Sequence, residues 1–143
     1  MDGSSGDGAT VDDLGLTPRC EEIVGRIGEE FLAAIYVAET ERRPDNIAAL
    51  AELGHVYTRL GRYEDGLAVD AKLVEMAPDD PTVRYNLACS QALVGRLDAA
   101  LDTLGVAVDL GYDDVAFMRD DDDLASLRGD PRFEALVQRL AAD

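Results

Sequence analysis

Two segments of this chain match each other at an offset of thirty-four residues, and this internal repeat constrains the fold more than any other feature. The segments are 53–67, LGHVYTRLGRYEDGL, and 87–101, LACSQALVGRLDAAL. Most of the matching positions hold Leu, Gly or Ala, and the match continues beyond the segments to Asp80 and Asp114. A repeat of about this length with two helical patterns per period is typical of stacked helix pairs.

Ahead of the repeats, one long helix is predicted over 18–43. Thr17 can cap its free amides, Pro18 is tolerated at the first helical position, and Pro44 ends the helix. Its apolar residues recur three and four apart and form one stripe, which contains Ile23, Ile27, Phe31, Ala34, Ile35 and Ala38. Residues 1–16 hold too few apolar side chains to offset the entropy of ordering, so a disordered acidic tail is predicted there.

Each repeat predicts two helices joined by a glycine. In the first repeat, 47–80, Asp45 is expected to cap the first helix, and Gly61 supplies the left-handed backbone at its exit. The second repeat, 81–114, follows the same plan, with Gly95 at the equivalent exit. Small residues at the predicted helix crossings let the backbones approach to about 8–9 Å, and these residues are Gly54, Gly66, Ala88 and Ala100.

The last part of the chain, 115–143, departs from the repeat and is predicted to be a helical cap. Asp130 and Pro131 begin its terminal helix with a capping residue followed by proline. A cap with a polar outer side keeps an open row of helices from exposing its final apolar face. The acidic run 120–123 is expected to be a solvated turn that caps the next short helix, because its consecutive acids lack the alternating ligand positions of a calcium loop.

Charge narrows the class of partner. Thirteen basic residues against thirty acidic ones give a net charge of −17, which repels phosphate backbones and anionic lipid. We therefore expect a neutral or basic protein partner, and neither nucleic acid nor a membrane, although an acidic surface also serves solubility alone. The N-terminus lacks the apolar segment of a secretory signal, and Cys20 and Cys89 have no metal or redox spacing, so a reduced cytoplasmic chain is expected.

The repeat resembles that of tetratricopeptide repeat (TPR) proteins. The matching positions are Leu53, Gly54, Tyr57, Gly61, Tyr63 and Pro78 in the first copy, and Leu87, Ala88, Gly95, Ala100 and Ala107 in the second. The segment 110–136 is similar to the closing segment of many bacterial members, the TPR end-of-group segment. One departure is Asp70, where the family has an aromatic residue. The resemblance implies an all-α, right-handed α-solenoid, with an N-terminal helix and a C-terminal helical cap in a single domain, 17–143.

For function, the resemblance implies that a peptide or helix binds in a concave groove lined by the first helix of each pair. The candidate groove residues are His55, Arg59, Tyr85, Asn86 and Cys89. The amide of Asn86 can donate and accept at once, and Tyr85 can offer an aromatic surface with a polar tip. Capping by Asn86 and simple helix packing by Tyr85 are equally open. Arg59 can pair with an acidic ligand group or merely complement the helix dipole.

These features favour a non-catalytic protein-binding module or assembly adaptor that is a monomer or a weak homodimer. The sequence shows no phosphate-binding loop, no nucleophile elbow and no second histidine, so we expect neither catalysis nor a cofactor. A different interpretation is a structural protein that self-associates through helix 18–43. A remote one is a metal-dependent enzyme around His55 and Cys89, although two ligands are fewer than a zinc site uses.

Overall fold

The computed structural model describes residues 17–143, and over that range the chain is helical and contains no strand. This confirms the all-α class predicted from the sequence. In chain order the helices are α1 (Pro18–Arg42), α2 (Ile47–Arg59), α3 (Tyr63–Met76), α4 (Pro81–Leu93), α5 (Leu97–Asp109), α6 (Val115–Asp120), the 3₁₀ helix η2 (Asp122–Leu127) and α7 (Pro131–Ala142). The disordered tail predicted for 1–16 lies outside the described residues.

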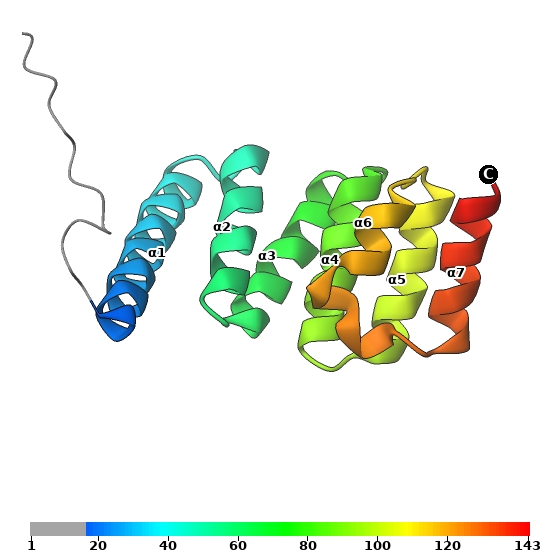
Figure 1. Cartoon of the computed structure of the whole chain (residues 1–143). Helices are drawn as coiled ribbons and strands as arrows, with labels where there is room; N and C mark the ends of the chain where they lie inside the picture. Colours follow the sequence, from blue (N-terminus) through cyan, green and yellow to red (C-terminus); the bar gives the residue numbers. More distant parts are fainter. Residues whose placement is uncertain (1–16) are drawn as a thin grey trace, which may run out of the picture.

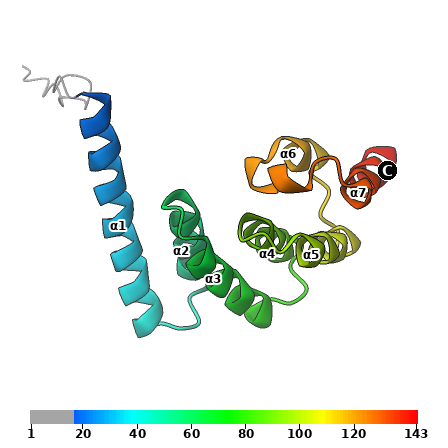
Figure 2. The same ribbon diagram turned by 90° about the horizontal axis from the view of Figure 1, so that it is seen from below.

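The helices form a row that runs from α1 at one end to α7 at the other (Figure 1). Within the row α2 packs on α3 and α4 packs on α5, while α3 also contacts α4 and thereby joins the two pairs. Helices α2 and α4 begin at Ile47 and Pro81, thirty-four residues apart, so the sequence repeat corresponds to a repeat of helix pairs. The view from below shows α6 and η2 lying over α4 and α5 as a second layer (Figure 2).

The ends of the helices follow the predicted signals at most positions. The side chain of Thr17 accepts a hydrogen bond from the Cys20 amide at the start of α1, and Asp80 and Asp130 cap α4 and α7 in the same way. Gly61 and Gly95, with φ of 73° and 83°, adopt the left-handed backbone that ends α2 and α4. Glycine reaches this conformation without the steric cost of a Cβ atom.

The predicted cap of α2 is wrong by one residue, because Asn46 and not Asp45 is the N-cap. The Asn46 side-chain oxygen accepts from the Ala49 amide at 3.1 Å, and its Nδ2 donates to Glu39 Oε1 at 3.1 Å. An aspartate could cap the helix equally well but has no hydrogen to donate. The second bond therefore selects the asparagine, and it ties the start of α2 to the end of α1.

The crossing of α2 and α3 lies at the predicted glycines. A Cβ atom on Gly66 would lie 3.7 Å from the Gly54 carbonyl oxygen, which shows how closely the two backbones approach. A Cβ atom on Gly54 would lie 3.1 Å from Asp70 Oδ1. The equivalent residues of the second pair, Ala88 and Ala100, are fully buried in the largest core cluster, which α4, α5, α6, η2 and α7 share.

The two ends of the row differ in how they are covered. Phe133 and Val137 of α7 are buried in the core, and the helix turns a polar side outward. Among the 25 residues of α1, only Ala33 is buried. Within residues 17–143 we find no helix that combines the length and the apolar character needed to cross a bilayer.

Candidate functional site

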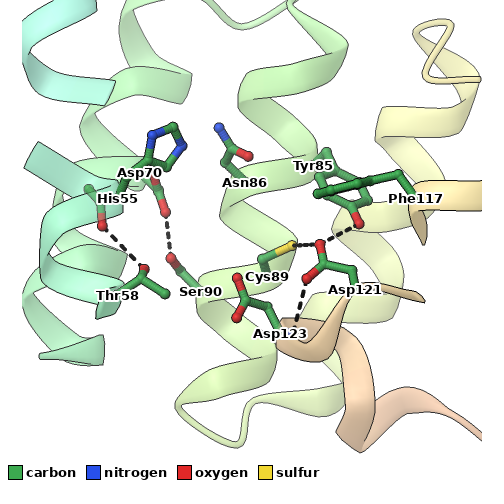
Figure 3. Close-up of a pocket in the computed structure, with 11 residues that line it drawn as sticks. His55, Thr58, Asp70, Tyr85, Asn86, Cys89, Ser90, Phe117, Asp121 and Asp123 are labelled. Atoms are coloured by element: carbon green, nitrogen blue, oxygen red, sulfur yellow. Dashed lines mark hydrogen bonds between the residues drawn. The ribbon is translucent and has the colours of Figure 1, made fainter. Parts of the chain in front are cut away.

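A hollow of about 160 Å³ lies between the two helix pairs, and we call it the α2–α4 hollow (Figure 3). Helices α2 and α4 supply most of its wall, α3 contributes one aspartate, and the segment joining α6 to η2 closes one side. Its lining residues are Gly54, His55, Thr58, Asp70, Tyr85, Asn86, Cys89, Ser90, Phe117, Asp121 and Asp123. Three of these side chains are carboxylic acids, and the single histidine of the chain is the one basic group among them.

At the α2 side of the hollow, Asp70 is a buried acid with one side-chain partner. The Ser90 hydroxyl of α4 donates a hydrogen bond to its carboxylate. Burial raises the pKa of Asp70 above its ordinary value of 3.8, and this effect outweighs the opposing influence of the Ser90 hydrogen bond and of His55. A buried charge with so little compensation is expensive to keep ionised, so this part of the wall favours protons or cationic groups.

At the opposite side, Tyr85 belongs to the packed wall. Its hydroxyl donates to Asp121 Oδ2 at 2.7 Å, and its ring stacks on Tyr112 with centroids 4.2 Å apart and planes within 2°. Phe117 tilts against the same ring, with centroids 6.0 Å apart. The packing alternative for Tyr85 is therefore what the structure shows, and the residue fixes the α6–η2 segment to α4.

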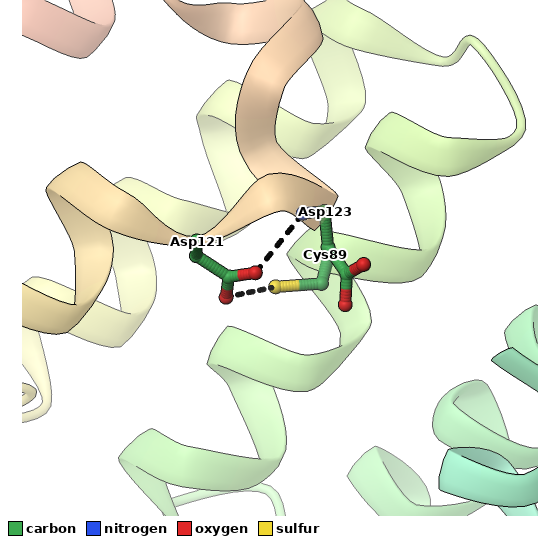
Figure 4. Close-up of side chains that lie close together, drawn as sticks. All are labelled: Cys89, Asp121 and Asp123. Atoms are coloured by element: carbon green, nitrogen blue, oxygen red, sulfur yellow. Dashed lines mark hydrogen bonds between the residues drawn. The ribbon is translucent and has the colours of Figure 1, made fainter. Parts of the chain in front are cut away.

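Cys89, Asp121 and Asp123 each have a side-chain atom of a kind that can bind a metal, and these three atoms lie within 4.8 Å of one another (Figure 4). Asp121 is already engaged, because its Oδ2 accepts from the Cys89 thiol at 3.7 Å as well as from Tyr85, and its Oδ1 accepts from the Asp123 amide at 3.0 Å. Burial raises the pKa of the Cys89 thiol far above its usual range. The sulfur is therefore a neutral hydrogen-bond donor to Asp121.

Asp123 leaves its carboxylate facing the hollow. Burial, and after it the neighbouring carboxylates of Asp121 and Asp122, raise the pKa of Asp123 above 3.8, while His55 opposes the shift. The predicted solvated turn at 120–123 is thus wrong for two of its residues, because Asp121 and Asp123 are half-buried. The predicted capping role is confirmed, since Asp121 caps η2.

The structure brings together four of the five predicted groove residues. His55, Tyr85, Asn86 and Cys89 all line the hollow, and Figure 3 shows His55 and Asn86 without a hydrogen bond to the other residues drawn. Arg59 lies elsewhere. Its Nε donates to Glu29 Oε1 of α1 at 3.0 Å, so it joins α1 to α2 instead of facing the hollow.

Sequence reasoning missed the acidic part of the wall. Two of its residues could have been found by comparing the two copies of the repeat. Asp70 stands where the second copy has Leu104, and Ser90 stands where the first copy has Val56. Asp121 and Asp123 gave no usable signal. They reach Cys89 across more than thirty residues of sequence, through the way α6 and η2 fold back over α4.

No protein-family model matches the chain. Over 108 residues the chain is 28% identical to a protein of Arabidopsis thaliana whose name describes it as chloroplastic, a match that covers 73% of this chain and 32% of that protein. The chain therefore spans about a third of the length of the curated relative it matches.

Proposed function

We propose that this chain is a non-catalytic protein-binding module of the TPR type, which holds a basic segment of a partner protein in the α2–α4 hollow. The TPR assignment is supported by the thirty-four-residue spacing of α2 and α4 and by the glycine exits at Gly61 and Gly95. In that arrangement α2 and α4 are the first helices of successive pairs and line the concave side of an α-solenoid.

The observation that carries the proposal is the chemistry of the hollow. Asp70, Asp121 and Asp123 line it together, and burial raises the pKa of Asp70 and of Asp123. A lysine or arginine side chain from a partner supplies that charge and its hydrogen bonds at once. The net charge of −17 steers such a partner toward the chain.

Two further groups suit peptide recognition. Asn86 is half-buried on α4, and its amide can donate to and accept from an extended backbone. His55 is half-exposed on α2, across the hollow. Specificity would then reside in residues that differ between the two copies of the repeat, whereas the shared Leu, Gly and Ala positions maintain the fold.

The chemistry of the wall disfavours catalysis. A protonated, buried Cys89 is a poor nucleophile, and the Tyr85 hydroxyl is committed to Asp121. The metal-enzyme alternative around His55 and Cys89 would need the Cys89 thiol to give up its hydrogen bond to Asp121. A stoichiometric divalent metal in the purified protein would favour that alternative. Two free thiols, on Cys20 and Cys89, suit a reducing compartment such as the proposed cytoplasmic location.

The test compares Asp123→Asn with Asp122→Asn. Both variants remove one negative charge from the same turn, but Asp123 is half-buried in the hollow and Asp122 is exposed outside it. Partners are captured from a lysate with the wild type, and affinities for a Lys-containing partner peptide are then measured by fluorescence anisotropy. We expect Asp123→Asn to weaken binding by about tenfold, or roughly 1.4 kcal/mol, and Asp122→Asn to change it little.

A second pair of variants tests the polar part of the wall. His55→Ala with Asn86→Ala should reduce capture of the same partner, while Gln138→Ala on the exposed side of α7 should not. Circular dichroism checks that helicity is retained. Equal loss of affinity in the Asp122 and Asp123 variants, or unchanged capture by the His55/Asn86 double variant, contradicts binding in the hollow.

A further inference from the structure

Helix α1 carries an apolar stripe that faces away from the rest of the molecule. Ile23, Ile27, Phe31 and Ile35 follow one another at four-residue steps, and they are 49%, 60%, 65% and 45% exposed. The main packing partner of α1 is α2, which covers the side that holds Ala33, Tyr36 and Val37. Figure 2 shows α1 at the end of the row, and among the described residues no other helix lies on its outer side.

The size of this surface exceeds what scattered apolar residues explain. Val24 and Leu32 adjoin the stripe and are also exposed. At about 100 Å² for each of the six half-exposed side chains, the surface amounts to roughly 600 Å², the upper end of what a monomeric protein presents. Two such surfaces brought together bury roughly 1,200 Å², which reaches the range of specific protein interfaces.

The contrast with the other end of the row indicates that the apolar stripe of α1 is covered by a partner. The outward side of α7 presents exposed polar groups, among them Glu134 and Gln138, as a terminal helix requires. The outward side of α1 presents isoleucine and phenylalanine. Residues 1–16 hold only Val11, Leu14 and Leu16 as large aliphatics, too few to match the six side chains of α1.

The stripe is complementary to itself when two copies run antiparallel. Its four residues are evenly spaced about residue 29, so a two-fold axis there places Ile23 opposite Ile35 and Ile27 opposite Phe31 in both directions. Such reciprocal contacts define a symmetric dimer interface. A shallow hollow lined by Ile35, Ala38, Glu39 and Arg42 adjoins the stripe at its Ile35 end.

We propose that α1 pairs with α1 of a second copy, in antiparallel orientation about residue 29, to form a homodimer whose two α2–α4 hollows remain open. The net charge of −17 on each copy opposes this association. Added salt screens the repulsion and leaves the apolar contact in place. The dimer therefore strengthens as salt is raised, the reverse of the behaviour expected for a basic segment bound in the hollow.

The first experiment measures mass by sedimentation equilibrium over a concentration series, at about 0.05 M and about 0.5 M salt. We expect the wild type to shift from one chain mass toward two, and to do so at lower concentration in the higher salt. Ile27→Glu with Phe31→Glu should stay monomeric. Gln138→Glu with Ala141→Glu adds the same charge on the exposed side of α7 and should still dimerise.

The second experiment tests the orientation by disulfide formation under mild oxidation. In the antiparallel pair the two Cys20 residues stand about 27 Å apart, at 1.5 Å per residue, and cannot link. Glu30→Cys in a Cys20→Ser background places the two introduced thiols on opposite sides of the two-fold axis, about 3 Å apart along the helix direction, and they should link. A wild-type disulfide through Cys20, a single-chain mass at every concentration, or a dimer that survives Ile27→Glu with Phe31→Glu overturns the proposal.

Discussion

At the scale of single residues, the wall of the hollow combines groups that repeat with groups that do not. Ala88 keeps the small size of Gly54 at the helix crossing, whereas Asp70 and Ser90 form a polar pair where the other copies of the repeat have Leu104 and Val56. An apolar pair would pack without any charge to desolvate. The polar pair thus gives the hollow its acidity at the expense of stability.

Asp70→Asn tests this cost through pH. Because burial raises the pKa of Asp70 in the folded state, the folded chain binds more protons than the unfolded chain just above pH 3.8. Stability is therefore lost as the pH rises through that window. We expect Asp70→Asn to be as stable as the wild type at pH 3.5 and more stable at pH 8, by on the order of 1–3 kcal/mol.

Urea unfolding at a series of pH values gives the comparison. Asp102→Asn, which removes an exposed carboxylate, controls for the change in net charge. A difference between Asp70→Asn and the wild type that does not grow with pH would show that Asp70 is ionised in the fold at little cost.

Only some residues of the site could be predicted from the sequence. Positions on α2 and α4 follow from the repeat, because the offset of thirty-four residues fixes which residues share a face. The burial of Tyr85 and the position of Asp121 beside it do not follow from the repeat, since both depend on where the non-repeating α6–η2 segment folds. Arg59 was misplaced because the partner that draws it away, Glu29, lies on a helix outside the repeats.

At the scale of elements, a proline or glycine follows the C-terminal end of most helices, and the all-helical class was predictable. Small residues also predicted where α2 crosses α3. At the start of α2 the predicted cap, Asp45, was wrong, because the choice of Asn46 depends on a hydrogen bond to Glu39 that no local pattern encodes.

Two glycines within helices should respond oppositely to substitution. A Cβ atom on Gly105 of α5 has open space around it, so Gly105→Ala is expected to stabilise by about 0.5–1 kcal/mol through the lower entropy of the unfolded chain. At Gly54 a Cβ atom lies 3.1 Å from Asp70 Oδ1. Gly54→Leu is therefore expected to destabilise by roughly 1–3 kcal/mol through overpacking.

Thermal and urea unfolding of the two variants provide the measurement. Gly54→Ala serves as an intermediate step, and it should gain less than Gly105→Ala. If Gly54→Leu melts at the wild-type temperature, α2 and α3 do not approach as closely as the structure indicates.

At the scale of the whole molecule, the chain is an open row whose two ends are finished differently. α7 seals one end by placing Phe133 in the core shared with α4 and α5. The other end presents the stripe of α1. The proposed binding hollow lies between these ends, and its far wall, α6–η2, is itself held in place by the sealed end.

The contribution of α7 to the stability of the fold can be measured by truncating Phe133, its main buried aromatic side chain. Phe133 is 2% exposed, so Phe133→Ala is expected to cost about 3–5 kcal/mol. Phe117→Ala is the matched control, because Phe117 is 54% exposed and should cost less than about 1 kcal/mol. Similar urea midpoints for the two variants would mean that α7 contributes little to the stability of the row.

The single packed side of α1 has a consequence for the order in which the molecule opens. Backbone amides exchange with solvent through local openings, and the openings of least cost occur where few apolar contacts must be broken. We therefore expect amide exchange to begin in α1 and to reach α4 and α5 last. Pairing of α1 with a second copy would slow that exchange as the protein becomes more concentrated, so the rigidity of this end would depend on the abundance of the protein itself.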